Sequence, residues 1–131
     1  KHIHEWNDLR RKWAARYTAG LKGARNIDLP HEWPGYRHVF HLYVIETKKP
    51  EWRDRLLKHL NDGGVDAKTH YSIAIHKQEG FPWGKDARLT GSLTNAEKNA
   101  ASCISLPLFP ELTEEEIQYT IQVVRDWPKH K

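Results

Sequence analysis

The chain has 131 residues, the size of a single domain, and its hydrophobic fraction of 38% is enough to form a core. Its composition excludes a disordered chain of low hydrophobicity, and its apolar runs are too short to cross a bilayer as helices. The formal net charge of +4 favours anionic partners such as phosphates. Because the basic residues are interleaved with Asp and Glu, we expect no nucleic-acid surface and no membrane contact.

The first predicted helix covers residues 1 to 22. Its apolar stripe follows three- and four-residue steps and contains Trp6, Leu9, Trp13, Tyr17 and Leu21. The helical pattern is already under way at the first residue, with no methionine and no capping residue before it. We therefore expect this chain to be part of a longer protein.

Two strand-like segments and a second helix are predicted next. Residues 39 to 47 are rich in β-branched and aromatic side chains and predict a central strand. Pro50 opens a helix that ends at Gly63 and Gly64. Residues 65 to 75 predict a second strand, and residues 77 to 93, with their glycines and prolines, predict a long loop.

Two capping-box sequences predict the last two helices. The first, Thr-Asn-Ala-Glu at residues 94–97, opens a helix to about residue 102, and a short apolar strand follows at residues 103–106. The second, Thr-Glu-Glu-Glu at residues 113–116, opens a helix whose core positions are Ile117, Ile121, Val124 and Trp127. The order of elements predicts an α/β (α+β) fold of two layers, in which helices pack on a small sheet and the first helix projects.

The candidate binding residues lie between residues 70 and 77. His70, Tyr71, His76 and Lys77 surround a short apolar run at the point where the second strand would leave the core. Imidazole, phenol and ammonium groups can all donate hydrogen bonds to a diphosphate or a sugar hydroxyl. We predict that these four residues bind substrate, and the alternative is that the histidines are structural. A second phosphate site is possible at the helix N-terminus after residues 91–94, where capping by Thr94 is the simpler interpretation.

Other chemistry finds little support in the spacing of reactive residues. The nine histidines include no set with the spacing of a tetrahedral zinc site, so we expect no metal. Cys103 lies in an apolar run, which favours a small buried hydrophobe over a nucleophile. As the one cysteine of the chain it fits a reducing, cytoplasmic compartment. We predict no catalytic residue.

Four segments together resemble the C-terminal small domain of the DegT/DnrJ/StrS family of pyridoxal-phosphate (PLP)-dependent nucleotide-sugar aminotransferases. Residues 5–17 contain an Arg-Arg pair followed by Ala and Tyr, and residues 41–45 read His-Leu-Tyr-Val-Ile. Residues 64–76 begin with Gly-Val and contain His-Tyr and a second His. Residues 96–116 contain Ala-Glu, Ser-Leu-Pro and Leu-Thr-Glu-Glu-Glu. The match covers nearly the whole chain in the family's order.

The resemblance implies a domain that serves a transaminase of fold type I, which moves an amino group from glutamate to a keto-sugar nucleotide. Residues 1–23 would be the connecting helix, and residues 24–131 the small C-terminal α/β domain that caps the cofactor cleft. His70 and Tyr71 would contact the sugar or diphosphate, and His76 would line the same pocket, whereas Lys77 is added from its charge alone. The family's proline between the two histidines is Ala74 here, which changes the backbone stiffness beside the substrate.

The resemblance also places the family's Schiff-base lysine, its pyridinium-pairing acid and its phosphate cradle upstream of Lys1. It implies a detached substrate-facing domain without a cofactor of its own, inactive alone, whose partner is the missing N-terminal PLP domain. The alternative is a stand-alone interaction module that keeps this fold without catalysis. Its stripe of Trp6, Trp13 and Tyr17 would be exposed without the large domain and would favour a homo-dimer. A third interpretation, a basic nucleic-acid binder, predicts a steep salt dependence.

Overall fold

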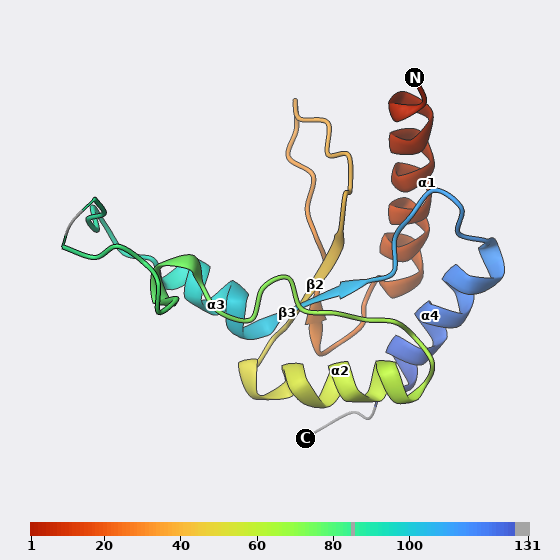
Figure 1. Cartoon of the computed structure of the whole chain (residues 1–131). Helices are drawn as coiled ribbons and strands as arrows, with labels where there is room; N and C mark the ends of the chain where they lie inside the picture. Colours follow the sequence, from red (N-terminus) through yellow and green to blue (C-terminus); the bar gives the residue numbers. More distant parts are fainter. Residues whose placement is uncertain (85, 128–131) are drawn as a thin grey trace.

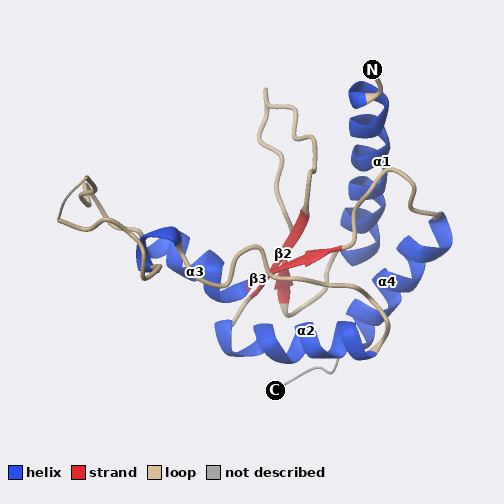
Figure 2. Ribbon diagram, viewed as in Figure 1, coloured by secondary structure: helices blue, strands red, loops and turns tan. Residues whose placement is uncertain are grey.

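The structure is a computed structural model that describes residues 1–84 and 86–127. Within these residues, helices surround a small antiparallel sheet (Figure 1; Figure 2). The elements in chain order are α1 (Ile3–Leu21), β1 (Ile27–Asp28), β2 (Tyr43–Thr47), the 3₁₀ helix η1 (Pro50–Trp52), α2 (Arg53–Asp62), the 3₁₀ helix η2 (Ile75–Lys77), α3 (Thr94–Ser102), β3 (Cys103–Leu106) and α4 (Glu114–Asp126). The predicted α/β fold, a small sheet with packed helices, is confirmed.

The sheet has the order β1-β2-β3, with β2 in the centre and antiparallel to both neighbours. In β2, Tyr43, Ile45 and Thr47 are buried and alternate with half-buried residues, as a strand with one face on the core requires. All four residues of β3 are buried. Helix α2 packs against β3 and α4, and α3 packs against β2. The core therefore lies between the sheet and the helices.

Helix α1 has two different halves. Its N-terminal half projects from the body, and Trp6 is 43% exposed (Figure 1). Its C-terminal half packs on α4, where Trp13 and Tyr17 are buried. The indole of Trp13 donates to the Pro110 carbonyl at 3.3 Å, and the Tyr17 hydroxyl donates to the Pro107 carbonyl at 2.9 Å. The expectation that Trp13 and Tyr17 would be exposed without a large domain is therefore wrong, because the chain's own C-terminal third covers them.

The predicted strand at residues 39–47 begins four residues late, at Tyr43. Phe40 has a φ of 49°, a left-handed conformation that a non-glycine residue rarely adopts and that interrupts an extended chain. Its ring is nevertheless buried and lies 6.2 Å from the Tyr43 ring at an interplanar angle of 26°. Burial of the aromatic ring thus fixes a turn where the sequence pattern predicts a strand.

The predicted strand at residues 65–75 is wrong. The segment touches the edge of β3 at one residue, where the Lys68 and Ser105 backbones exchange hydrogen bonds of 3.1 and 2.7 Å. Beyond Lys68 the chain leaves the sheet, and Tyr71 and Ile73 are exposed. A strand is stabilised by burying one face and pairing its edge, and these residues do neither.

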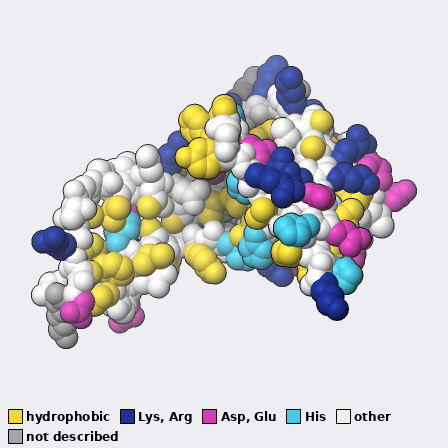
Figure 3. All heavy atoms as spheres, turned by 90° about the horizontal axis from the view of Figure 1, so that it is seen from above, with side chains coloured by type: hydrophobic (Ala, Val, Ile, Leu, Met, Phe, Trp, Pro, Cys, Tyr) yellow, Lys and Arg dark blue, Asp and Glu magenta, His cyan; other side chains and the backbone are white. Residues whose placement is uncertain are grey.

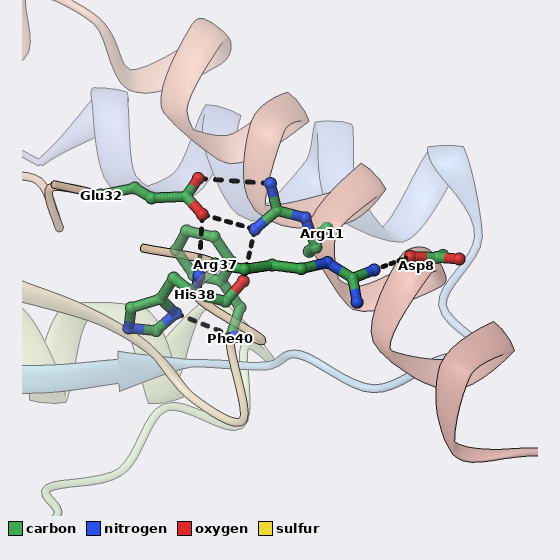
Figure 4. Close-up of polar contacts among 6 residues, drawn as sticks. All are labelled: Asp8, Arg11, Glu32, Arg37, His38 and Phe40. Atoms are coloured by element: carbon green, nitrogen blue, oxygen red, sulfur yellow. Dashed lines mark hydrogen bonds and ion pairs between the residues drawn. The ribbon is translucent and has the colours of Figure 1, made fainter. Parts of the chain in front are cut away.

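The loop of residues 29–42 runs beside α1 and is fastened to it by charged groups (Figure 4). The Arg11 guanidinium contacts both carboxylate oxygens of Glu32, at 2.6 and 3.3 Å, and Glu32 also accepts from the His38 backbone N–H at 2.7 Å. Arg37 of the loop pairs with Asp8 of α1. The hydrogen bonds from Arg11 and then from the His38 backbone hold the pKa of Glu32 below its usual value.

None of the helices in residues 1–84 and 86–127 combines the length and apolar character needed to cross a lipid bilayer.

Candidate functional site

The predicted binding residues lie at the start of a long segment that connects the sheet edge to α3. We call residues 71–84 and 86–93 the arm, because they extend away from the sheet and return at α3 (Figure 1). Seen from above, the arm stands apart from the body and carries hydrophobic side chains on this face (Figure 3). Large exposed side chains on the arm are Tyr71, Ile73, Ile75, Trp83 and Leu89. The arm agrees with the loop predicted for residues 77–93 but begins earlier.

His70 and Tyr71 leave the sheet edge beside β3. The Nδ1 atom of His70 is 2.9 Å from the Ser105 hydroxyl, and its ring is 5.9 Å from the Tyr71 ring at 80°. Tyr71 itself is 74% exposed. The thiol of Cys103 lies 3.9 Å from the Tyr71 carbonyl, so β3 contacts both residues. The result is a histidine held from one side next to an aromatic ring that faces solvent.

His76 and Lys77 lie on the short helix η2 and share one carboxylate of α3. His76 Nε2 is 3.0 Å from Glu97 Oε1, and Lys77 Nζ is 3.1 Å from Glu97 Oε2. The hydrogen bonds from His76 and then Lys77 hold the pKa of Glu97 below its usual value. The Trp83 indole N–H also donates to the His76 carbonyl at 2.8 Å. The His76 side chain is only 13% exposed, whereas that of Lys77 is 57% exposed.

The structure therefore arranges the four predicted residues as two pairs. His70 and Tyr71 contact β3, and His76 and Lys77 contact α3. Their contact with a substrate stays a prediction. Sequence reasoning missed Ser105 and Glu97, which hold the two pairs. The Thr-x-x-Glu pattern of residues 94–97 contains Glu97, but as a sequence pattern it predicts a helix cap. Helix α3 begins at Thr94, so its N-cap is Leu93, whose side chain cannot accept a cap hydrogen bond, and the predicted box does not form. The Ser92 hydroxyl accepts from the Thr94 backbone N–H at 3.3 Å, and Glu97 contacts the arm.

Two other candidates from the sequence are placed as follows. Cys103 is fully buried, and burial raises the pKa of its thiol, as suits a small hydrophobe in the core. In the part of the chain that the structure describes, no group of three or more His, Cys, Asp and Glu side chains could hold a metal ion. At the start of α3 the Ser92 and Thr94 hydroxyls contact each other at 2.6 Å.

Comparison with known proteins assigns this arrangement to a family. The model of the DegT/DnrJ/EryC1/StrS aminotransferase family matches residues 1–125. A dTDP-3-amino-3,4,6-trideoxy-alpha-D-glucose transaminase from Streptomyces venezuelae is 36% identical over 96% of this chain and 32% of its own length. A UDP-N-acetyl-3-dehydro-alpha-D-glucosamine 3-aminotransferase from Acidithiobacillus ferrooxidans is 34% identical over 95% of this chain and 31% of its own length.

Solved structures agree with the sequence relatives. The crystal structure of S. venezuelae DesV in complex with a ketimine intermediate superimposes with a TM-score of 0.87 at 35% identity, over 99% of this chain and 34% of that one. A Bacillus subtilis structure with bound cofactor PMP superimposes with a TM-score of 0.75 at 30% identity, over 91% of this chain and 27% of that one. The present chain thus spans about a third of the length of the relatives that it matches.

The family's cofactor can be tested against the residues present. A lysine that forms an aldimine with PLP needs a desolvated setting that lowers its pKa, and the ring nitrogen needs a carboxylate. Every lysine in residues 1–84 and 86–127 is exposed. Lys58, Lys68 and Lys77 are each paired at the surface with an Asp or a Glu. The described residues therefore do not fit a PLP aldimine.

Proposed function

The chain belongs to the DegT/DnrJ/EryC1/StrS aminotransferase family, and from this premise we propose that it supplies the substrate-facing wall of a nucleotide-sugar aminotransferase. The wall is the segment of residues 70–77. Its ligand is a nucleoside diphosphate keto-sugar, the class to which the dTDP- and UDP-sugars in the names of the relatives belong.

The exposed ring of Tyr71 beside an anchored His70 is the observation that carries this proposal. A side chain that is 74% exposed gains little from the fold, so its aromatic surface is available to a ligand. Ser105 holds His70 through Nδ1, which leaves the opposite nitrogen, Nε2, to exchange a hydrogen bond with a sugar hydroxyl or a phosphate oxygen. The two side chains together offer apolar contact and a polar handle, the usual composition of a ligand site.

We propose further that residues 1–131 do not transaminate by themselves. The lysines of residues 1–84 and 86–127 are all exposed and do not provide the amine that the reaction requires, so the contribution of these residues is to bind and orient the substrate. The chemistry that PLP supplies, stabilisation of negative charge at the carbon that carries the amino group, would come from a domain outside these residues. A transaminase assay of the purified chain with PLP and glutamate should give no turnover.

Calorimetry with dTDP-glucose tests the binding role directly. His70→Ala should weaken binding at least about ten-fold, because a hydrogen bond to a charged group contributes about 1.5–3 kcal/mol. His4→Ala removes an exposed histidine from α1 and serves as the matched control, with no expected change. Equal affinities of the His70→Ala variant and the wild type would remove His70 from the site.

A second candidate, an interaction module that forms a homo-dimer, is favoured by exposed aromatic side chains on the projecting half of α1 and on the loop of residues 29–42. Trp6 is 43% exposed, Trp33 69% and Tyr36 78%. Exposed apolar surface of this kind tends to be covered by a partner. Light scattering decides the point: a strict monomer at high concentration would contradict the dimer, and a concentration-dependent dimer lost in Trp33→Ser would support it.

A further inference from the structure

Glu97 lies in the first turn of α3, but its hydrogen-bond partners lie outside that helix. An acidic side chain in the first turn of a helix is ordinarily stabilised by the helix dipole and the free backbone N–H groups nearby. Each oxygen of Glu97 instead contacts a different residue of η2, His76 at 3.0 Å and Lys77 at 3.1 Å. One carboxylate of α3 thus fixes two consecutive side chains of a segment that is distant in sequence.

This contact and one other join side chains of residues 70–77 to side chains of α3 and β3. The other joins His70 to Ser105 of β3. Helix α3 ends at Ser102 and β3 begins at Cys103, so both contacts belong to one continuous helix–strand unit. Between them, Tyr71, Ile73 and Ile75 are 74%, 55% and 70% exposed. A stretch with so little burial owes its conformation to the contacts at its two ends.

We propose that Glu97 is a positioning residue that sets the conformation of the 70–77 segment, and that His76 is its anchor and not a ligand donor. The inference rests on the proposed function for the ligand, a nucleoside diphosphate sugar, that the positioned segment receives. His76 is suited to an anchor because it is 13% exposed, engaged by Glu97 through Nε2, and held at its carbonyl by Trp83. A segment ordered before binding loses less conformational freedom on binding, which strengthens affinity.

Two effects of replacing Glu97 on ligand affinity have opposite signs, one from charge and one from positioning. Glu97→Gln deletes a negative charge beside His76 and Lys77, and so should strengthen attraction of a diphosphate if electrostatics dominate. Loss of positioning should weaken binding, because Gln forms weaker hydrogen bonds to His76 and Lys77 than a carboxylate does. The direction of the change therefore separates the two roles.

The experiment combines an NMR titration with dTDP-glucose and backbone ¹⁵N relaxation in the same samples. In Glu97→Gln, affinity should fall at least about five-fold, and the order parameters of residues 71–77 should fall below about 0.6. Glu115→Gln, which removes the same charge from the exposed first turn of α4, should change neither quantity. His76→Gln/Glu97→Gln should bind no more weakly than Glu97→Gln alone, because the Glu97 change already weakens the contact with His76.

Distinct outcomes test the proposed function and the role of Glu97. If the wild type does not bind dTDP-glucose, the proposed function fails, and with it the role of Glu97 in substrate binding. If the wild type binds and Glu97→Gln binds equally well or better with residues 71–77 still ordered, the positioning role is overturned while the proposed function stands. Additive losses in the double variant would overturn the assignment of His76 as the anchor.

Discussion

The starts of α3 and α4 carry the same Thr-x-x-Glu sequence but use it differently. At α4, the Thr113 hydroxyl accepts from the Glu116 N–H at 3.2 Å, and the Glu116 carboxylate accepts from the Thr113 N–H at 2.8 Å. At α3, the Thr94 hydroxyl contacts Ser92, and Glu97 reaches out to η2. One motif is realised as a capping box, and the other is redirected to the candidate site.

The difference shows that a capping-box sequence does not form its local hydrogen bonds where a tertiary contact engages the same glutamate. Helix α4 buries Ile117, Ile121 and Val124, so its cap agrees with a position that the core already fixes. Helix α3 buries only Ala100 and Ser102, and its first turn faces the arm. Departures of this kind are expected at functional sites, where local rules conflict with the role of the residue.

The largest expected contrast between the two helices is in the free energy of unfolding that is lost when a buried side chain is truncated. Ile117→Ala should lower the free energy of unfolding by about 2–5 kcal/mol, because it opens a cavity at a fully buried position of α4. On α3, Ala100→Gly should cost only about 1 kcal/mol, the helix penalty of glycine. Urea denaturation of both variants checks the pair, and equal losses would contradict the unequal anchoring of the helices.

The two threonines should differ by a smaller amount. Thr113→Ala should cost about 1 kcal/mol, since it removes a cap that satisfies the Glu116 N–H. Thr94→Ala should change stability by less than about 0.5 kcal/mol, as for a surface position, because its side chain caps no backbone group of α3. A loss of about 1 kcal/mol from both substitutions in thermal unfolding would mean that the box at α3 forms in solution.

The smallest effect is the pH dependence of the contact between Glu97 and η2. Because the pKa of Glu97 is lowered from 4.5, the contact contributes stability above that pH and loses it as the pH falls through the lowered value. Titration of the Glu97 carboxyl carbon by NMR should give a pKa below 4.5, and His76→Gln should raise it. A wild-type pKa at or above 4.5 would show that the carboxylate is free.

Several elements of the fold could be predicted because their pattern is local and periodic. The stripe of α4 and the Pro50 start of the second helix place these elements to within a few residues. The extents of the strands predicted for residues 39–47 and 65–75 differ from the structure, because tertiary contacts that periodicity does not contain decide where a strand forms. Phe40 adopts a positive φ with its ring buried in the core, and beyond Lys68 the side chains of Tyr71 and Ile73 are exposed.

The segment proposed as the binding site could be chosen from the sequence, but its contacts could not be predicted from it. The concentration of donors at residues 70–77 is visible in the chain, as is the resemblance of that segment to the family. The pairing of His70 with Ser105 and of His76 with Glu97 joins residues 35 and 21 positions apart, which no local pattern encodes. The same holds for Arg11 and Glu32, which fasten the loop of residues 29–42 to α1.

Chemical-shift mapping of the ¹⁵N-labelled chain with dTDP-glucose tests the central claim most directly. If residues 70–77 form the wall that receives a nucleotide sugar, the largest shift changes will be confined to this segment and to the Ser105 and Glu97 regions that hold it. Saturating changes elsewhere, for example in the groove between Val65, Phe109 and Tyr119, would contradict the account, as would no change at any concentration.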